Sequence, residues 1–499
     1  MLLSVSVAAV IISGTLFASY VMNERTEEIP VSGGIWREGV VGQPVFINPI
    51  ISGNDADQDI SRLIFAGLAD MSDDIRSDES GRIWTVRIKE GIKWHDGEKI
   101  TSDDVIYTFD TIIDPESRSP ISGNFDGASV SRVSELEVKF TLPSSYVFFE
   151  TTLKNMRVIP KHIFGNIPPA NFNLSSYVRE PVGSGPYKYE SYKKERDGFV
   201  SEYRLVANKE YFGDKPYITR FVFMFYADED HMAKAYMNGE IDGFVAGDPK
   251  TAGSISVRRD IKVLDAPRYY AIFPNPSLIS LFRDVSFRKD LSDAISRDRI
   301  VSVVFDGFAA PLIGPIPGEG SVENSDIDLE GISLDLTVPD LRPLLETAEI
   351  VKSDWESRGA TININALRPT DIQESIKNRS YEAILFGNIL NEPEDFYSFW
   401  HSSKRFYPGL NLAMFNDKNA DVLMETIRTV KDPEERSALV SRLISLITDS
   451  VGAIFIASPD YVYITSPKLK GFHAENVVTV ADRLSSVSDW YLGTARKLK

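Results

Sequence analysis

The sequence contains no cysteine among its 499 residues. Thiol nucleophiles, disulfide bonds and thiolate metal sites are therefore excluded, because each of them needs a cysteine sulfur. A lipid anchor attached through a cysteine thioether is excluded for the same reason. Cysteine usage consequently says nothing about the redox compartment in which the protein works.

Histidine is scarce, with five in the chain, and none are paired at the i,i+4 spacing of a helical zinc site. His95 and His162 are therefore interpreted as structural residues. The acidic stretch 55–59 resembles the start of a calcium loop, which needs glycine at its sixth position and glutamate at its twelfth. Ile60 and Ala66 stand there, so we expect no metal site, and the aspartates are expected to begin a helix over 60–68.

Positive charge is in deficit, since 54 Lys and Arg face 72 Asp and Glu and give a net charge of −18. Such a chain is poorly suited to nucleic acid, whose binding needs clustered basic residues. It also lacks the phosphate-cradling G-x-x-x-x-G-K-[ST] motif, so any ATP hydrolysis would belong to a partner.

No pattern for catalysis is evident. Gly183–Gly185 does not fit a nucleophile elbow, and it precedes Pro186, which has no amide hydrogen to donate to a phosphate. We interpret it as a crossing turn near a hinge. Because no pair of carboxylates forms a catalytic arrangement either, we expect no enzymatic activity and no cofactor.

The N-terminus does contain a long hydrophobic run. Leu2–Met22 carries no charge, and as a helix it would measure about 30 Å, enough to cross a bilayer core. A cleaved secretory signal would need a basic start and a small-x-small cleavage site, and neither is clear. We therefore favour an uncleaved membrane anchor over 1–22, followed by a charged tether over 23–32.

The most informative stretch is 84–113. Trp84, Val86 and Ile88 alternate with polar residues, as in a half-buried strand. A tight turn follows, and Thr101 stands three residues before Asp104, which predicts a capping box and a helix.

Two separate series of alternating strands and helices predict two α/β lobes. The first has strands over 221–225 and 241–246 with a helix between them. The second has strands over 332–338, 361–367 and 381–386, with helices over 341–358 and 371–378. Ligands of open α/β sheets bind beyond the carboxyl ends of the strands, so we expect a binding crevice between the lobes.

The motif WTVRIKEGIKWHDGEKITSDDV resembles the signature of the family 5 extracellular solute-binding proteins, the dipeptide, oligopeptide and nickel receptors of ABC importers. Further segments resemble the same family in the same order along the chain: Val182–Tyr187, Leu205–Phe212 with Lys215-Pro216, Phe287–Asp298 and Asn391–Pro393. The resemblance extends from about Gly33 to near the C-terminus.

This resemblance implies an α/β, two-lobed periplasmic-binding-protein-like fold (type II, large peptide-binding cluster) with an inserted domain and an N-terminal hydrophobic helix. We assign lobe I to residues 33–70, 181–272 and 469–499, the inserted domain II to 71–180, and lobe III to 273–468.

The resemblance also implies which residues line the ligand site: Gln43, Pro44, Tyr270, Asn275, Phe386, Gly387, Asn388, Asn391 and Glu392. Where the family has an aspartate that pairs with a peptide's amino group, this chain has Ile389. Glu392, three residues further on, is the alternative carboxylate.

The function implied by the resemblance is that of an extracytoplasmic receptor, at the cell surface or in the periplasm. It would capture peptide-like solutes by hinge closure and deliver them to ABC permease and ATPase subunits. Two alternatives stay open: a membrane-tethered solute sensor, and a receptor for a non-peptide solute such as a sugar oligomer or a metal chelate.

Overall fold

The computed structural model describes residues 26–51, 53–316, 327–474 and 477–498. The predicted membrane segment lies outside these residues, as does the start of the tether. Within the described ranges, no helix combines the length and hydrophobicity that a bilayer crossing requires.

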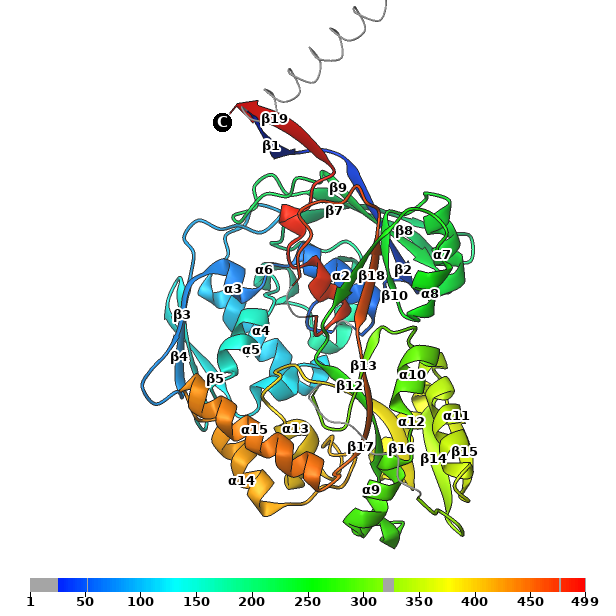
Figure 1. The fold of residues 1–499 in the computed structure, drawn as a ribbon. Coiled ribbons are helices and arrows are strands. Elements are labelled where there is room, and N and C mark those ends of the chain that lie inside the picture. Colours follow the sequence, from blue (N-terminus) through cyan, green and yellow to red (C-terminus); the bar gives the residue numbers. More distant parts are fainter. Residues whose placement is uncertain (1–25, 52, 317–326, 475–476, 499) are drawn as a thin grey trace, which may run out of the picture.

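Lobe I is built on a seven-stranded sheet with the order β11-β18-β10-β2-β9-β8-β7, in the upper part of Figure 1. Its strand β2 pairs in parallel with β9 and β10, which confirms the predicted β-α-β unit. The strands are β2 (Ile35–Val41), β7 (Tyr187–Lys194), β8 (Val200–Ala207), β9 (Arg220–Tyr226), β10 (Gly243–Ala246), β11 (Asp260–Leu264) and β18 (Tyr461–Thr465). The helices are α2 (Asp55–Ile64), α7 (Glu229–Met237), α8 (Lys250–Ser254), η7 (Val480–Leu484) and η8 (Val487–Asp489).

The inserted domain has a four-stranded sheet with the order β3-β4-β6-β5. The predicted alternation in β4 is confirmed, since Trp84, Val86 and Ile88 are buried. The capping box is confirmed as well, because the Thr101 amide donates to Asp104 Oδ2 at 2.9 Å. The strands are β3 (Ser72–Ser77), β4 (Ile83–Ile88), β5 (Ser129–Ser134) and β6 (Glu137–Thr141). The helices are α3 (Leu68–Met71), α4 (Ser102–Ile113), α5 (Phe149–Asn155), α6 (Lys161–Phe164), η1 (Pro115–Ser117), η2 (Ser122–Phe125), η3 (Pro169–Leu174) and η4 (Ser176–Val178).

Lobe III contains a six-stranded sheet with the order β13-β17-β12-β16-β14-β15. Its strand β14 pairs in parallel with β15 and β16, as the second series of strands and helices predicts. The strands are β12 (Arg268–Pro274), β13 (Ala309–Pro311), β14 (Ser333–Pro339), β15 (Thr361–Leu367), β16 (Ala383–Ile389) and β17 (Ile454–Pro459). The helices are α9 (Val285–Asp293), α10 (Arg297–Val304), α11 (Arg342–Glu356), α12 (Pro369–Asn378), α13 (Tyr397–Trp400), α14 (Lys418–Ile427), α15 (Pro433–Asp449), η5 (Ser280–Arg283) and η6 (Ser402–Lys404).

The chain crosses between the sheets of lobe I and lobe III at two places. One crossing is 265–267, between β11 and β12, and the other is Asp460, between β17 and β18. Both come earlier than the domain boundaries expected at 272 and 468, because long-range strand pairing decides to which sheet a strand belongs.

The helix expected over 60–68 runs instead from Asp55 to Ile64. Asn54 caps it, since its side chain accepts from the Asp57 amide at 2.8 Å. The acidic residues therefore lie within the helix, and Asp59 is buried inside lobe I.

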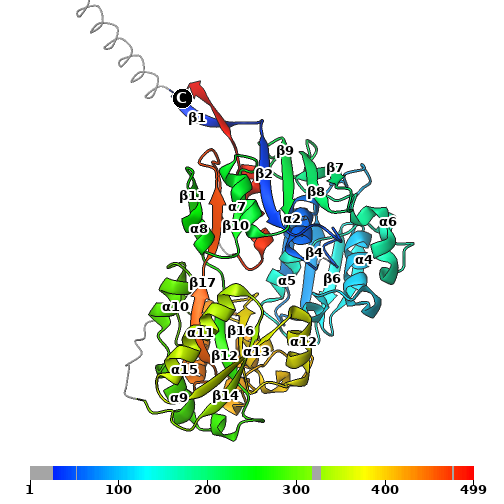
Figure 2. The same ribbon diagram turned by 90° about the vertical axis from the view of Figure 1, so that its right-hand side faces the viewer.

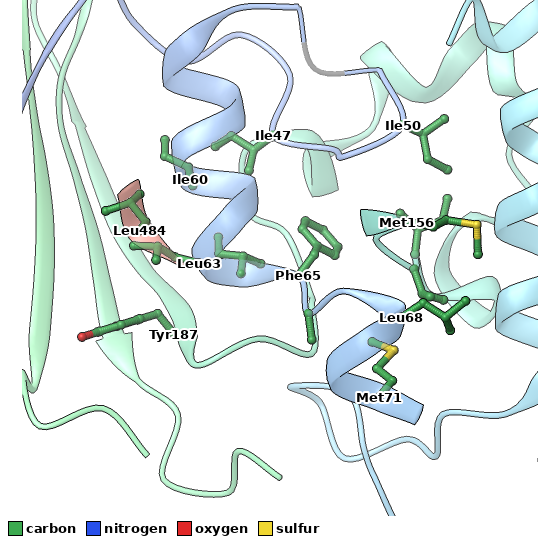
Figure 3. Packing of buried hydrophobic residues seen from close by; sticks show 14 of the residues in the cluster. Ile47, Ile50, Ile60, Leu63, Phe65, Leu68, Met71, Met156, Tyr187 and Leu484 are labelled. Carbon is green, nitrogen blue, oxygen red and sulfur yellow. The ribbon is translucent and has the colours of Figure 1, made fainter. Parts of the chain in front are cut away.

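Lobe I and the inserted domain share one hydrophobic core. It continues from Trp36 and Trp490 in lobe I to Trp84 and Phe140 in the inserted domain. Figure 3 shows how side chains of α2 and α3 pack beside Met156 at this junction. The lobe III sheet has two further clusters, one on each side, and one of them also includes Phe148 of the inserted domain. The packing thus divides the molecule into two bodies, lobe I with the inserted domain and lobe III (Figure 2).

A two-stranded ribbon projects from lobe I at the end opposite to lobe III (Figures 1 and 2). It consists of β1 (Thr26–Val31), within the expected tether, and β19 (Gly493–Leu498). Opposite charges face each other across it, because Glu27 pairs with Lys497 and Glu28 with Arg496. Such cross-strand pairs stabilise a ribbon modestly.

Candidate functional site: the facing edges of the two lobes

The parallel strands of both lobes end toward the crossings. In lobe III, the last residue of β16, Ile389, pairs with Arg268, the first residue after the 265–267 crossing. In lobe I, the last residue of β10, Ala246, pairs with Val462, which stands two residues after Asp460. Because β14 and β2 run parallel to these strands, the carboxyl ends of both parallel series face the junction of the lobes. This is the edge at which open α/β sheets bind ligands.

Arg268 fastens the two crossing segments together. Its Nε donates to the Pro459 carbonyl at 3.0 Å and its Nη2 to the Asp460 carbonyl at 2.7 Å. Burial raises the pKa of Asp460, and the nearby Asp265 carboxylate raises it further. The two crossing segments are therefore joined to each other by hydrogen bonds.

The predicted residues of β12 and β16 meet in the lobe III sheet. Tyr270 pairs with Gly387, and a Cβ on Gly387 would lie 2.6 Å from the Tyr270 ring. Glycine is needed there because the tyrosine ring covers the backbone. Phe386 is half-buried against the lobe III core, and Asn388 is buried, with its Nδ2 donating to the Tyr269 hydroxyl at 2.9 Å.

Two further predicted residues use their side chains to hold backbone. Buried Asn275 donates from Nδ2 to the Arg379 and Tyr381 carbonyls, both at 3.0 Å. Gln43, in the lobe I loop after β2, accepts from the Val200 amide at 2.8 Å. Pro44 follows it and is buried. The structure thus places these two loop residues in lobe I, across the junction from β12 and β16.

Glu392 occupies the segment that leaves the carboxyl end of β16, next to exposed Asn391. Its Oε1 is buried and has no hydrogen-bond partner. Burial raises the pKa of Glu392, whereas a hydrogen bond with the Thr151 side chain of the inserted domain lowers it. The carboxylate therefore lies where the inserted domain meets lobe III.

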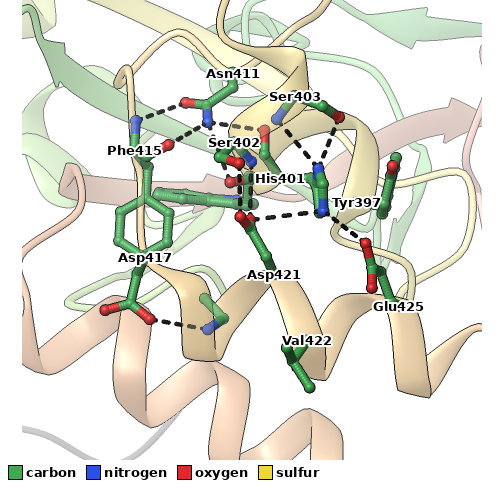
Figure 4. A network of polar contacts seen from close by, with 12 residues as sticks. Tyr397, His401, Ser402, Ser403, Asn411, Phe415, Asp417, Asp421, Val422 and Glu425 are labelled. Atoms are coloured by element: carbon green, nitrogen blue, oxygen red, sulfur yellow. Dashed lines mark hydrogen bonds and ion pairs between the residues drawn. The ribbon is translucent and has the colours of Figure 1, made fainter.

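A polar network that the sequence did not reveal supports this part of lobe III (Figure 4). Its centre is buried His401, whose ring stacks on Tyr397 with centroids 4.1 Å apart. His401 Nδ1 accepts from the Ser403 amide at 3.2 Å, and its Nε2 lies 3.4 Å from Glu425 and 3.7 Å from Asp421. These residues match no recognisable sequence motif. They come together only in the folded chain, so the sequence could not reveal the network.

The Gly183–Gly185 turn lies where the chain passes from the inserted domain back into lobe I, and it contacts both of them. The Ser184 and Gly185 amides donate to the Ile64 carbonyl at 3.0 and 2.7 Å. The Gly183 amide donates to His95 Nδ1 at 3.2 Å, and His95 Nε2 lies 3.0 Å from the Gly185 carbonyl. Burial lowers the pKa of His95 to about 4, so its ring is neutral at pH 7. One ring nitrogen can then accept from the Gly183 amide while the other donates to the Gly185 carbonyl.

Comparison with known proteins decides the family. Residues 68–407 match the middle region of the bacterial extracellular solute-binding proteins, family 5. The chain belongs to this family of solute receptors. The resemblance seen in the sequence motifs is confirmed over more than half of the chain.

Individual relatives align with this chain along almost its whole length. The oligopeptide-binding protein AppA of Bacillus subtilis (strain 168) is 24% identical over 495 residues, which cover 89% of each chain. The substrate-binding protein CtaP of Listeria monocytogenes superposes with a TM-score of 0.80 at 24% identity, covering 92% of this chain and 99% of that one. AppA in complex with a nonapeptide gives 0.74 at 24% identity over 93% and 100%. NikZ of Campylobacter jejuni in complex with Ni(L-His) gives 0.73 at 21% identity over 92% and 99%. These superpositions confirm the predicted two-lobed fold.

Proposed function

We propose that this family 5 protein is the extracytoplasmic receptor of an ABC importer for peptides or peptide-like solutes. The ligand is held between lobe III and the body formed by lobe I with the inserted domain. Closure about 265–267 and Asp460 traps it, because the ligand contacts both bodies only when they are closed. The closed form then delivers the ligand to the permease, and the ATPase supplies the energy.

The observation that carries this proposal is the division of the core into two bodies whose strand ends face each other at a two-segment hinge. Hinge closure around a ligand needs this arrangement. The similarity to AppA, which binds oligopeptides, supports peptides as the ligand class.

Among the predicted residues, we propose two roles. Tyr270, Phe386, Gly387, Asn391 and Glu392 shape the lobe III side of the ligand site. Three other predicted residues hold backbone beside the junction through internal hydrogen bonds or a rigid ring: Gln43, Pro44 and Asn388. Asn275 holds backbone at the opposite edge of the lobe III sheet, where β16 begins, and so lies away from the proposed ligand site.

The departure at Ile389 bears on ligand charge. This side chain is 47% exposed and cannot pair with an ammonium group. Glu392 is nearby in sequence and has an oxygen without a hydrogen-bond partner. We propose that Glu392 is the counter-charge for the amino group of a peptide ligand.

The ligand class is tested by thermal unfolding against a panel: a nonapeptide, its N-acetylated form, a dipeptide and a nickel–histidine chelate. A ligand at a hundredfold excess over its dissociation constant stabilises the folded state by about 2.7 kcal/mol. We expect the free nonapeptide to raise the melting temperature. If the chelate alone does so, the exposed apolar Ile389 belongs to a receptor for a non-peptide solute instead.

The role of Glu392 is tested by the change Glu392→Gln, with exposed Glu434→Gln as the control. Calorimetric titration should show that the wild-type protein prefers the free nonapeptide over the acetylated one by about tenfold, the value of a charge-assisted hydrogen bond. The variant should lose this preference and the control should keep it. Equal affinities for the two peptides in the wild-type protein would remove Glu392 from this role.

We also propose that residues 2–22 tether the receptor to the outer face of the cell membrane. The sensor alternative has no specific support in the described residues, whereas the facing strand ends suit capture and release.

A further inference from the structure

One segment of the inserted domain is embedded in lobe III. Phe148 is 7% exposed and belongs to a lobe III cluster together with Trp400 and Phe455. Tyr146 and Val147 pack against the same cluster. The remaining buried residues of that cluster come from the lobe III side of the hinge, so this segment reaches across from one body into the core of the other.

An arginine of lobe III holds the embedded segment. The Arg428 guanidinium lies 4.4 Å from the centroid of the Tyr146 ring and 4.5 Å from that of the Tyr397 ring. It is therefore stacked between aromatic rings of the two bodies, a favourable position for a cation. Arg428 Nε also lies 3.3 Å from Asp395, to which the Tyr146 hydroxyl donates at 2.9 Å.

Deprotonation of the Tyr146 hydroxyl does not weaken this contact near neutral pH. Burial raises the pKa of Tyr146 and the neighbouring Asp395 carboxylate raises it further, against the opposing effect of Arg428. The hydroxyl therefore remains a donor to Asp395.

Backbone contacts lengthen the same interface. The Val147 amide donates to the Arg428 carbonyl at 2.9 Å. Lys431 Nζ donates to the Asp78 and Glu79 carbonyls of the inserted domain at 3.0 and 2.8 Å. The contact thus extends beyond one side-chain pair and runs along one edge of the junction.

Movement at the hinge would separate the two sides of this interface. The inserted domain shares its core with lobe I, so it moves with lobe I when the bodies separate about 265–267 and Asp460. Opening that separates the bodies at this edge withdraws Phe148 from lobe III and unstacks Tyr146 from Arg428.

We infer that Tyr146, Val147 and Phe148, together with Arg428, form a latch that stabilises the closed state independently of the ligand. This inference rests on the proposed function, because it assumes that the hinge opens and closes. None of the latch residues belongs to the proposed ligand-contacting set.

A latch of this kind has a distinctive effect on binding. The apparent dissociation constant equals the intrinsic one divided by the fraction of protein in the binding-competent state. A latch that raises the closed fraction therefore strengthens the binding of every ligand by the same factor. A residue that contacts ligand would instead change the affinities for different ligands by different factors.

The first test measures opening without any ligand. Because the chain has no cysteine, cysteines introduced at exposed Lys99 in the inserted domain and exposed Ser441 in lobe III can carry spin labels. We expect the ligand-free wild-type protein to show a short-distance population that Phe148→Ala reduces in favour of longer distances. Phe406→Ala, which removes an aromatic ring that is 65% exposed, should leave the distribution unchanged.

The second test measures affinity for the free nonapeptide, its acetylated form and the dipeptide. Phe148→Ala should raise the dissociation constant of every peptide that binds by one common factor, roughly tenfold or more, given the apolar area that opening exposes. Tyr146→Phe keeps the ring and loses only the hydroxyl contact, so we expect a common factor of about threefold. Far-ultraviolet circular dichroism confirms that each variant is folded.

Identical distance distributions in wild-type protein and Phe148→Ala would overturn the latch, as would factors that differ from one peptide to another. If no peptide binds the wild-type protein, the peptide proposal fails, but the ligand-free distances still decide whether the latch exists.

Discussion

Replacing Arg483 by alanine should destabilise the protein by about 3–5 kcal/mol, the cost of leaving buried charges without their partner. Arg483 is 1% exposed and lies between two buried carboxylates. It donates to Glu38 Oε1 at 2.8 and 3.0 Å and to the two oxygens of Asp59 at 2.7 and 2.6 Å. The other Glu38 oxygen accepts from Trp36 and Tyr463, each at 2.8 Å.

Urea denaturation measures this loss, with the change Arg442→Ala on the exposed face of α15 as the matched control. The control should shift the midpoint little, because no buried charge is left behind. Equal midpoints for the two variants would contradict a structural role for the buried ion pairs.

The loss in Arg483→Ala should also depend on pH. Burial raises the pKa of Glu38 and Asp59 above their ordinary values of 4.5 and 3.8, and Arg483 opposes that rise. Without the guanidinium the folded-state pKa values rise further, so the folded variant takes up protons more readily than the unfolded chain. Its deficit should therefore be greatest at pH 7 and shrink as the pH falls toward 4.

The second large effect is expected for Gly183→Ala, at about 1–3 kcal/mol, the range typical of overpacked interiors. A Cβ at residue 183 would lie 2.1 Å from the Ile64 carbonyl oxygen. Backbone atoms cannot move aside as a flexible side chain can, so the turn must shift. The shift would strain the hydrogen bonds that Ser184 and Gly185 donate to the Ile64 carbonyl within lobe I. It would also strain the bond from the Gly183 amide to His95 of the inserted domain.

Thermal unfolding compares this variant with Gly123→Ala, since a Cβ at residue 123 meets no atom within 4 Å. We expect Gly183→Ala to melt well below the wild-type protein and Gly123→Ala to melt close to it. A Gly183→Ala variant as stable as the control would mean that the turn relaxes without cost.

Local features of the fold could be predicted from the sequence because they depend on neighbouring residues. The alternation in β4 and the Thr101–Asp104 cap are set within a few positions of the chain. The parallel series in both lobes followed from the order of strands and helices. The bounds of α2 were wrong, because Asn54 offered an earlier cap than the acidic residues suggested.

Contacts between distant segments could not be predicted. Arg483 lies 445 residues from Glu38 in the chain, and nothing near either residue indicates the other. The same holds for Tyr146 and Asp395, which are 249 residues apart. For the site itself, the sequence identified candidate residues near the ends of strands. It could not show that the side-chain amides of Asn275 and Asn388 donate hydrogen bonds to other groups within lobe III.

The β1–β19 ribbon has a practical consequence for anyone who wants to attach something to this receptor. Its register sets Thr26 beside Leu498, so a fluorescent protein or affinity tag fused after the last residue would emerge next to the N-terminal segment. Lobe III lies at the far end of the molecule (Figure 2), and its exposed helical faces offer a position for a reporter that leaves the ribbon unencumbered.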